Sequence, residues 1–206
     1  MPRTTFTRLI ALMVGFASTP LVAQSQPTLR QMAIEQGGIN RLTIGCGPTP
    51  SLAGIVKEAD LIVEGVVHKR VSYLTADDDN VYTDYELSID EVLFERQMLT
   101  TSRPGIVAPM VFKSRGGRVV IDGLQIVDDV RGNNARVDIK EGDHVFVFGK
   151  RDAKDGKWIL WPYDVFQVIG GNVVAPDTFS DVAKSVRREQ FLHKIRQLQM
   201  AAGVPF

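Results

Sequence analysis

The sequence predicts a mainly β protein: an OB-like small β-barrel with a short N-terminal helix and a C-terminal amphipathic helix. Three observations lead to this class. Apolar residues alternate with a period of two through much of residues 61–169, glycine-containing turns separate these stretches, and the spacing becomes helical near the C-terminus. The chain has 206 residues, enough for one domain to bury a core that needs neither disulfides nor a structural metal.

Residues 1–23 have the pattern of a removable secretory signal peptide. Arg3 and Arg8 provide a positive start, residues 9–16 form an apolar run too short to span a bilayer, and Leu21-Val22-Ala23 ends the segment as a signal peptidase site does. We therefore expect a periplasmic or secreted protein with no stable membrane anchor after cleavage.

Cysteine usage and glycosylation signals bear on the source of the chain. Cys46 is the single cysteine, so no intramolecular disulfide forms, and the chain contains no Asn-x-Ser/Thr site. Small secreted domains of eukaryotes usually carry several disulfides. Both features favour a bacterial exported protein.

Residues 24–47 are expected to form an N-terminal arm or linker. They contain one short possible helix, Leu29–Gln36, with Thr28 as its cap and Gly37 as its stop. A second short helix is predicted to begin at Thr49-Pro50 and to end just before the first strand.

The OB-like barrel domain is assigned to residues 48–175. Its first two strands run from about 61 to 74 and from about 82 to 90, and the polar segment Thr75–Asn80 joins them as a hairpin loop. The first strand begins with apolar residues on both faces, which is typical of a strand buried on both sides. The remaining predicted strands are rich in Val, Ile, Phe or Trp: Ile106–Lys113, Arg118–Ile121, His144–Arg151, Trp158–Trp161 and Val165–Ile169.

Residues 176–206 are assigned to a C-terminal helix packed on the barrel, and Gly123–Glu141 to an irregular excursion closed by the turn Gly142-Asp143. Thr178 or Ser180 is the expected N-cap of the helix. Apolar residues at helical spacing form its buried stripe: Val182, Val186, Phe191, Ile195 and Leu198.

Three segments carry a family resemblance: Ala59–Val67, Tyr82–Tyr85 and Ile89–Leu93. With them the chain resembles exported bacterial proteins of unknown function that have an OB-like barrel, and it is distantly similar to the netrin-like domain of tissue inhibitors of metalloproteinases. The likeness covers roughly residues 46–171 and implies a fold more than an activity. Those inhibitors chelate zinc with an N-terminal cysteine, whereas Cys46 lies well inside the predicted mature chain, so no inhibitory residue is carried over.

Composition and missing motifs narrow the function. The 24 Lys and Arg residues balance the 24 Asp and Glu residues, and no long basic run occurs, which argues against nucleic acid as a partner. The chain has no phosphate-binding loop, dinucleotide fingerprint or Gly-x-Ser-x-Gly elbow. Accordingly, no cofactor and no catalytic residue is predicted.

The hairpin loop supplies the candidate site residues. Asp77, Asp78 and Asp79 are weak calcium candidates, because Ca²⁺ prefers carboxylate oxygens, but Val81 stands where the calcium-loop pattern needs a ligand. The same three aspartates together with Asn80 are candidate partner-binding residues. A solvated hairpin loop is the alternative interpretation.

Histidines and tryptophans provide weaker signals. His68, His144 and His193 lie far apart in the sequence, so ordinary structural or surface roles are expected. Trp158 and Trp161 flank a predicted strand and favour packing over a carbohydrate platform.

The preferred hypothesis is an exported, non-catalytic binding or interaction module whose partner is an unknown protein or envelope component. Thr75–Asn80 and Gly123–Glu141 are the expected contact regions, because OB barrels bind through loops and the adjoining face. The alternative is an exported hydrolase or metal-dependent enzyme whose site, drawn from His68, His144, Cys46 or the acidic tract, is assembled only in three dimensions. A structural envelope component is a third hypothesis.

Overall fold

The computed structural model describes residues 26–45, 51–96, 109–132, 139–160, 164–176, 179 and 181–203. Strands dominate these ranges, with a short helix near the N-terminal side and a longer helix near the C-terminal side, so the predicted mainly β class is confirmed. The predicted signal peptide, Cys46, Thr49-Pro50 and Trp161 lie outside the described residues. Within the described ranges, no helix is both long and apolar enough to cross a bilayer.

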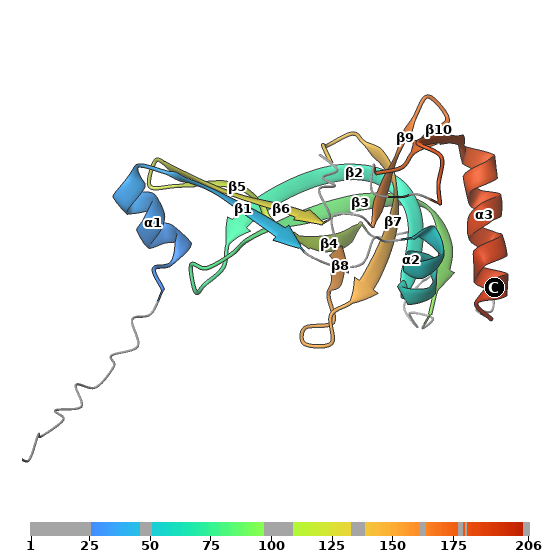
Figure 1. Ribbon diagram of the computed structural model, residues 1–206, viewed down its shortest axis with the longest axis horizontal. Coiled ribbons are helices and arrows are strands. Elements are labelled where there is room, and N and C mark those ends of the chain that lie inside the picture. The colour runs from blue at the N-terminus through green and yellow to red at the C-terminus, as the bar shows by residue number, and fades with distance from the viewer. Residues whose placement is uncertain are drawn as a thin grey trace, which may run out of the picture.

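Figure 1 shows the elements spread along one long axis. Helix α1 lies with β1, β5 and β6 at one end, a curved sheet occupies the middle, and α2 and α3 lie at the other end. In chain order the elements are α1 (Leu29–Gln36), β1 (Ile39–Gly45), α2 (Leu52–Glu58), β2 (Leu61–Leu74), β3 (Val81–Glu95), β4 (Met110–Arg115), β5 (Gly117–Ile121), β6 (Leu124–Gly132), β7 (His144–Arg151), β8 (Trp158–Leu160), β9 (Val165–Ile169), β10 (Asn172–Val174), β11 (Ser185–Arg187) and α3 (Arg188–Ala201).

Five strands form the OB-like barrel. Strand β2 pairs antiparallel with β3 on one side and with β7 on the other, and β3 pairs with β4. Strand β8 completes the ring, because it pairs parallel with β4 over Phe112–Ser114 and antiparallel with β7 at Lys150 and Arg151. Since a strand of only three residues makes this closure, the barrel is partly open, as OB barrels are.

Both faces of the first half of β2 are buried. Leu61, Val63 and Val67 belong to the barrel interior, whereas Ile62 belongs to a second core that also includes residues of α2 and α3. Five phenylalanines dominate the second core, with neighbouring ring centroids 5.0–5.5 Å apart: Phe146, Phe148, Phe166, Phe179 and Phe191. Burying one such side chain contributes about 1.5–3 kcal/mol. These two cores explain why the start of this strand is apolar on both faces.

The predicted arm at residues 24–47 holds more structure than its sequence indicates. Thr28 caps α1 through a capping box, and Gly37 ends the helix with a φ of 70°, both as predicted. Beyond the helix, β1 pairs parallel with β6 in a separate three-stranded sheet of order β1-β6-β5. The strand escaped prediction because its partner lies far later in the chain.

The expected excursion Gly123–Glu141 is wrong for its first part, which is strand β6, joined to β5 by a hairpin. Asp128, which is 1% exposed, lies in this strand. Its carboxylate accepts hydrogen bonds of 2.9 and 2.6 Å from the Arg41 guanidinium. A carboxylate at an inward-facing position hides the apolar alternation of a strand, which is why the sequence indicated irregular structure here.

Close backbone contact joins the three-stranded sheet to the long β2–β3 hairpin. Thr83 Oγ1 donates a 2.7 Å hydrogen bond to the carbonyl of Gly116 and lies 2.8 Å from Ser72 Oγ. At Gly117, with φ 144°, a Cβ atom would lie 2.3 Å from Thr83 Oγ1 and 2.7 Å from Ser72 Oγ. Only a glycine fits this contact without displacing the hydroxyl pair.

The C-terminal helix begins later than its apolar stripe predicts. Val186 lies in β11, where it pairs with Val173 of β10, and α3 starts only at Arg188. Phe191 and Ile195 are buried in the second core, as the predicted packing of this helix on the barrel requires. Strand pairing therefore overrides the helical spacing at the first positions of the stripe. The expected N-cap at Thr178 or Ser180 is wrong, because Arg187 holds the N-cap position of α3.

Helix α2 starts at Leu52 with two caps. Ser51 Oγ accepts a 3.0 Å hydrogen bond from the Gly54 amide, and the Asp181 carboxylate accepts one of 2.9 Å from the Leu52 amide. Because an orphan N–H group at the helix start is satisfied by a residue close to the C-terminal helix, these two parts of the chain stabilise each other.

Replacing Gly117 by alanine is expected to lower the free energy of unfolding by about 1–3 kcal/mol, because the new methyl group enters the Thr83–Ser72 hydroxyl pair at a backbone angle that disfavours side chains. Urea unfolding followed by circular dichroism measures the effect. Arg118→Ala, at the exposed neighbouring position, serves as the control; equal stability of the two variants would contradict the prediction.

Candidate functional site

The acidic loop, Thr75–Asn80, is closed by hydrogen bonds of its own. The Thr75 amide donates to the Asn80 carbonyl at 2.8 Å, and the Asp78 amide donates to the Thr75 carbonyl at 2.9 Å. The Thr75 hydroxyl donates to the carboxylate of Asp77, and the Asp79 amide donates to the same carboxylate at 3.3 Å. These bonds, that of Thr75 foremost, hold the pKa of Asp77 below its ordinary value.

The acidic loop also docks the N-terminal helix. The Leu29 amide at the start of α1 donates a 2.9 Å hydrogen bond to the carbonyl of Asp78. Asp78 and Asn80 are half-buried, whereas Asp77 and Asp79 are exposed. Of the four predicted contact residues, two thus face solvent and two lie partly within the fold.

A calcium site at Asp77, Asp78 and Asp79 stays a sequence-based prediction. No three His, Cys, Asp or Glu side chains in the described ranges are grouped so that they hold a metal ion. The Asp77 carboxylate, moreover, already accepts the hydrogen bonds that close the loop.

A tyrosine pair stands beside the acidic loop, on the outer face of the barrel. Tyr73 at the end of β2 lies opposite Tyr82 at the start of β3, and their rings stack with centroids 6.4 Å apart. The ammonium group of Lys113 on β4 lies 5.5 Å from the Tyr82 ring centroid, within cation–π distance. We call these three side chains the tyrosine face.

Carboxylates surround the tyrosine face. The Tyr73 hydroxyl donates a 3.1 Å hydrogen bond to Asp84, and the Lys113 ammonium lies 3.1 Å from Asp155 and 3.6 Å from Asp152. Burial, followed by the negative charge of Asp84, raises the pKa of Tyr73 to about 12. The face therefore presents two phenol rings and an ammonium group that is paired with carboxylates.

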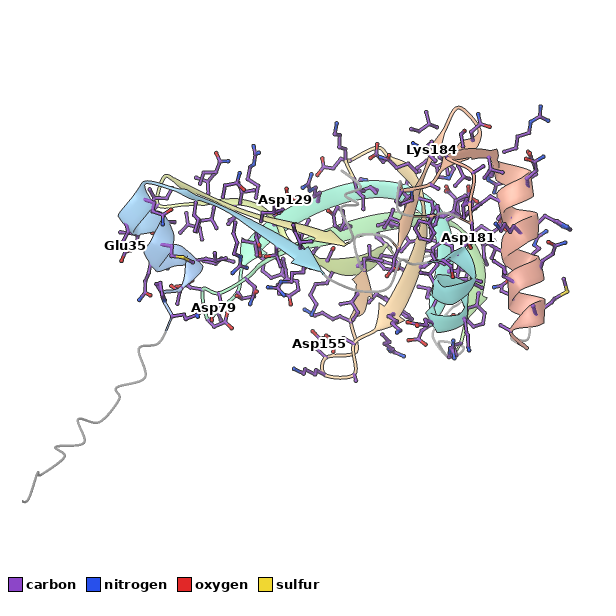
Figure 2. The ribbon with its side chains drawn as sticks, in the orientation of Figure 1. Glu35, Asp79, Asp129, Asp155, Asp181 and Lys184 are labelled. Carbon is purple, nitrogen blue, oxygen red and sulfur yellow. The ribbon has the colours of Figure 1, made fainter. Side chains whose placement is uncertain are left out.

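The tyrosine face overlaps the surface that OB barrels use for ligands, the second and third barrel strands between the first and last hairpin loops, and extends it by Tyr73 at the end of β2. Here these parts are β3, β4, the acidic loop and the β7–β8 loop. Figure 2 shows Asp79 on the former loop and Asp155 on the latter. Sequence reasoning missed this face because a tyrosine on each side of a hairpin loop becomes a pair only once the register of the hairpin is known.

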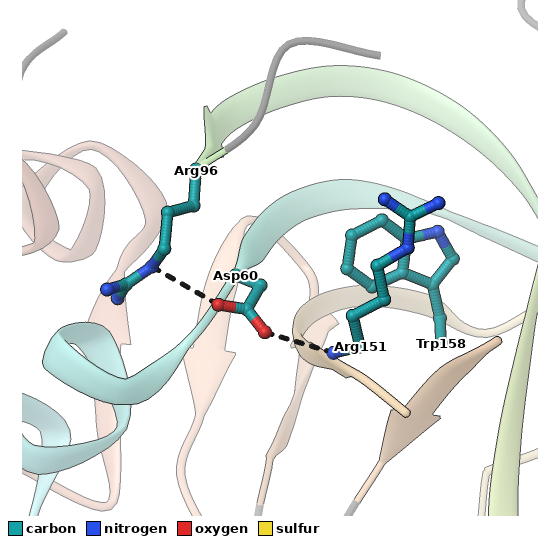
Figure 3. A pocket seen from close by; sticks show the side chains of 4 residues that line it. All are labelled: Asp60, Arg96, Arg151 and Trp158. Atoms are coloured by element: carbon teal, nitrogen blue, oxygen red, sulfur yellow. Dashed lines mark hydrogen bonds and ion pairs between the residues drawn. The ribbon is translucent and has the colours of Figure 1, made fainter. Parts of the chain in front are cut away.

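A pocket of about 110 Å³ lies where β7 ends and β8 begins. It is lined by Asp60, Arg96, Arg151 and Trp158. Figure 3 shows Asp60 between the two arginines: its carboxylate forms an ion pair with Arg96 Nε on one side and accepts a hydrogen bond from the Arg151 backbone amide on the other. Trp158 packs on Phe112 of the barrel interior at 6.5 Å between centroids, which confirms packing as one role of this residue.

A buried carboxylate links the barrel to the C-terminal helix. Glu64 on β2 is 1% exposed and accepts hydrogen bonds of 2.7 and 2.6 Å from Arg188, the first residue of α3. This pairing, with its hydrogen bonds to Glu64 foremost, raises the pKa of the Arg188 guanidinium. His144 Nε2 lies 3.1 Å from Glu64 and 3.3 Å from Asp90, without hydrogen-bond geometry.

The histidines do not gather as the enzyme hypothesis requires. His144 belongs to the Glu64 network on β7, His193 contacts Gln197 on α3, and His68 lies exposed on β2. None of them lines the pocket near Trp158 or the second pocket, which lies between β3 and α3. Cys46 is outside the described residues.

Comparison of the chain with protein-family models and with curated proteins finds no match.

Removing the charge of Glu64 is expected to destabilise the folded protein. Glu64→Gln leaves the Arg188 guanidinium without its buried carboxylate partner and should lower the free energy of unfolding by about 1–3 kcal/mol. Chemical unfolding measures the change. Glu91→Gln, which removes the neighbouring carboxylate that is 41% exposed in its side chain, should cost less than about 1 kcal/mol. Equal losses for both variants would refute a special role of the buried pair.

The raised pKa of Tyr73 predicts a loss of stability at high pH. Because the folded state holds this phenol proton more tightly, with a pKa of about 12 against 10.0, its contribution is complete below pH 10.0 and is lost as the pH rises towards about 12. Tyr73→Phe should flatten the pH dependence of unfolding in that window. Phenolate absorbance gives the pKa directly, and Asp84→Asn should lower it; a Tyr73 that titrates at its ordinary value would contradict the assignment.

Proposed function

We propose that this protein is an exported, non-catalytic binding module of a bacterial cell, and that its ligand lies across the tyrosine face and the two loops beside it. The observation that carries the proposal is the stacked pair Tyr73 and Tyr82 with Lys113 above the ring. Aromatic rings with a polar edge bury a large apolar area at small conformational cost, so they are enriched in binding surfaces.

The position of this pair supports the same function. OB barrels commonly bind extended ligands on the corresponding strands, between the corresponding loops. The support is an analogy of fold, and it concerns where a ligand lies rather than which ligand it is. The exposed Asp77 and Asp79 extend the surface along the acidic loop.

Charge narrows the class of ligand. The ammonium group of Lys113 lies between Asp152 and Asp155, and Asp84 accepts from Tyr73, so the face carries no surplus of positive charge. Binding of nucleic acid depends on cations that neutralise phosphates. A protein or an envelope component without a dense negative charge therefore suits the face better.

The exported location rests on residues 1–23, whose charged start, short apolar run and small-residue end have the pattern of a signal peptide. A ligand would then be met in the periplasm or outside the cell.

Affinity capture from a cell-envelope extract and from culture medium tests the proposal, with the protein as bait. A partner retained by the wild type is expected to bind at least about 30-fold more weakly to the double variant Tyr73→Ala, Tyr82→Ala, because even one aromatic anchor commonly carries about 2 kcal/mol. Asp77→Ala with Asp79→Ala tests the loop in the same way.

The matched control removes apolar side chains elsewhere on the surface. Val120 and Ile169 are 64% and 60% exposed, and they belong to β5 and β9, strands that contribute no residue to the tyrosine face. Val120→Ala with Ile169→Ala should retain the partner. Equal recovery of the partner by the tyrosine variant and by this control would overturn the proposed contact surface.

A further inference from the structure

The pocket of Asp60, Arg96, Arg151 and Trp158 is a second candidate for binding, separate from the tyrosine face. Four parts of the barrel meet there: the start of β2, the end of β3, the end of β7 and the start of β8. Because Asp60 and Arg96 come just before and just after paired strands, their positions follow from the barrel itself rather than from a free loop.

Arg151 is held in place inside this pocket. Its guanidinium carbon lies 5.6 Å from the Trp158 ring centroid, and its Nε donates a 3.2 Å hydrogen bond to the carbonyl of Gly156. Its backbone amide donates to Asp60 at 3.1 Å. No described residue pairs with the two terminal nitrogens of this guanidinium group. Among the described residues, the planar donor pair of Arg151 is therefore available at the pocket.

In contrast to the terminal nitrogens of Arg151, the side chains of Arg96 and Asp60 already have partners within the protein. Arg96 Nε lies 3.2 Å from the Asp60 carboxylate, and its terminal nitrogen donates to the carbonyls of Lys57 and Ala59 at 2.7 and 3.0 Å. Asp60 accepts from both sides of the pocket. Two guanidinium groups and one carboxylate leave a single net positive charge at the site.

We propose that this pocket binds a carboxylate group, in the form of a sugar acid or the terminal carboxylate of a peptide. The two terminal nitrogens of Arg151 match the two oxygens of a carboxylate in a bidentate pair. A single positive charge balances a carboxylate, whereas a doubly charged phosphate would leave an unbalanced charge close to Asp60. Stacking on Trp158 holds the guanidinium group in advance, which lowers the entropic cost of binding.

This site goes beyond the proposed function and stands whether or not the tyrosine face binds a partner. NMR titration of the full protein tests it, with the indole N–H signal of Trp158 as the probe. The chain has two tryptophans, so Trp161→Phe identifies the signal. The titrants are D-glucuronate, N-acetylglycine, inorganic phosphate and uncharged glucose.

Saturable shifts of the Trp158 signal are expected with both carboxylates at millimolar concentration, where about −4 kcal/mol of binding free energy corresponds to a Kd of about 1 mM. Whichever of glucuronate and N-acetylglycine binds more tightly identifies the source of the carboxylate. Glucose should cause no saturable shift.

Variants at two adjacent residues locate the binding group. Arg151→Gln should weaken carboxylate binding about tenfold or more, since charge-assisted hydrogen bonds are worth about 1.5–3 kcal/mol. Lys150→Gln removes the same charge one residue away, from a side chain paired with Glu58 at 2.9 Å, and should leave binding unchanged.

Three results would overturn the proposal. The first is the absence of a saturable shift with either carboxylate. The second is equal binding by Arg151→Gln and the wild type. The third is tighter binding of inorganic phosphate than of both carboxylates.

Discussion

Burial of both faces of β2 is the constraint on which the rest of the structure depends. One face of this strand belongs to the barrel interior and the other to the phenylalanine-rich core of α2 and α3, so the strand needs partners on every side. β3 and β7 satisfy its hydrogen bonds, and the helices cover its outer face. Register shifts along its pairing with β3 bend the strand, as a small barrel requires. The second half of β2 then extends past the barrel and reaches the three-stranded sheet at β5.

Two buried carboxylates, each paired with an arginine, join the outer elements to this centre. Glu64 accepts from Arg188 at the start of α3, and Asp128 accepts from Arg41 of β1. Burying a charge pair contributes little net stability, but breaking one partner away is costly. The two pairs therefore favour the observed positions of α3 and of the three-stranded sheet over alternatives in which Glu64 or Asp128 is buried without its arginine.

The β7–β8 loop contributes to both surfaces that we propose for ligands. Its aspartates Asp152 and Asp155 pair with Lys113 at the tyrosine face, and the carbonyl of Gly156 in the same loop accepts a hydrogen bond from Arg151 at the Asp60 pocket. The strand that follows this loop, β8, also closes the barrel. The two proposed ligand surfaces and the barrel closure thus share one short segment, which contains the most weakly paired part of the ring.

Local patterns in the sequence determined much of the fold. Alternation in β2 and β3, the turn residues of the acidic loop and the caps of α1 act between near neighbours, and each was predictable. The acidic loop was found as a candidate contact region, but the tyrosine face and the Arg151 pocket were not. Strand β1, the buried role of Asp128 and the strand at Val186 depended on partners distant in the chain. Only the tertiary structure decided these, because a sequence shows which residues can be buried, while the register of long-range pairing decides which of them meet.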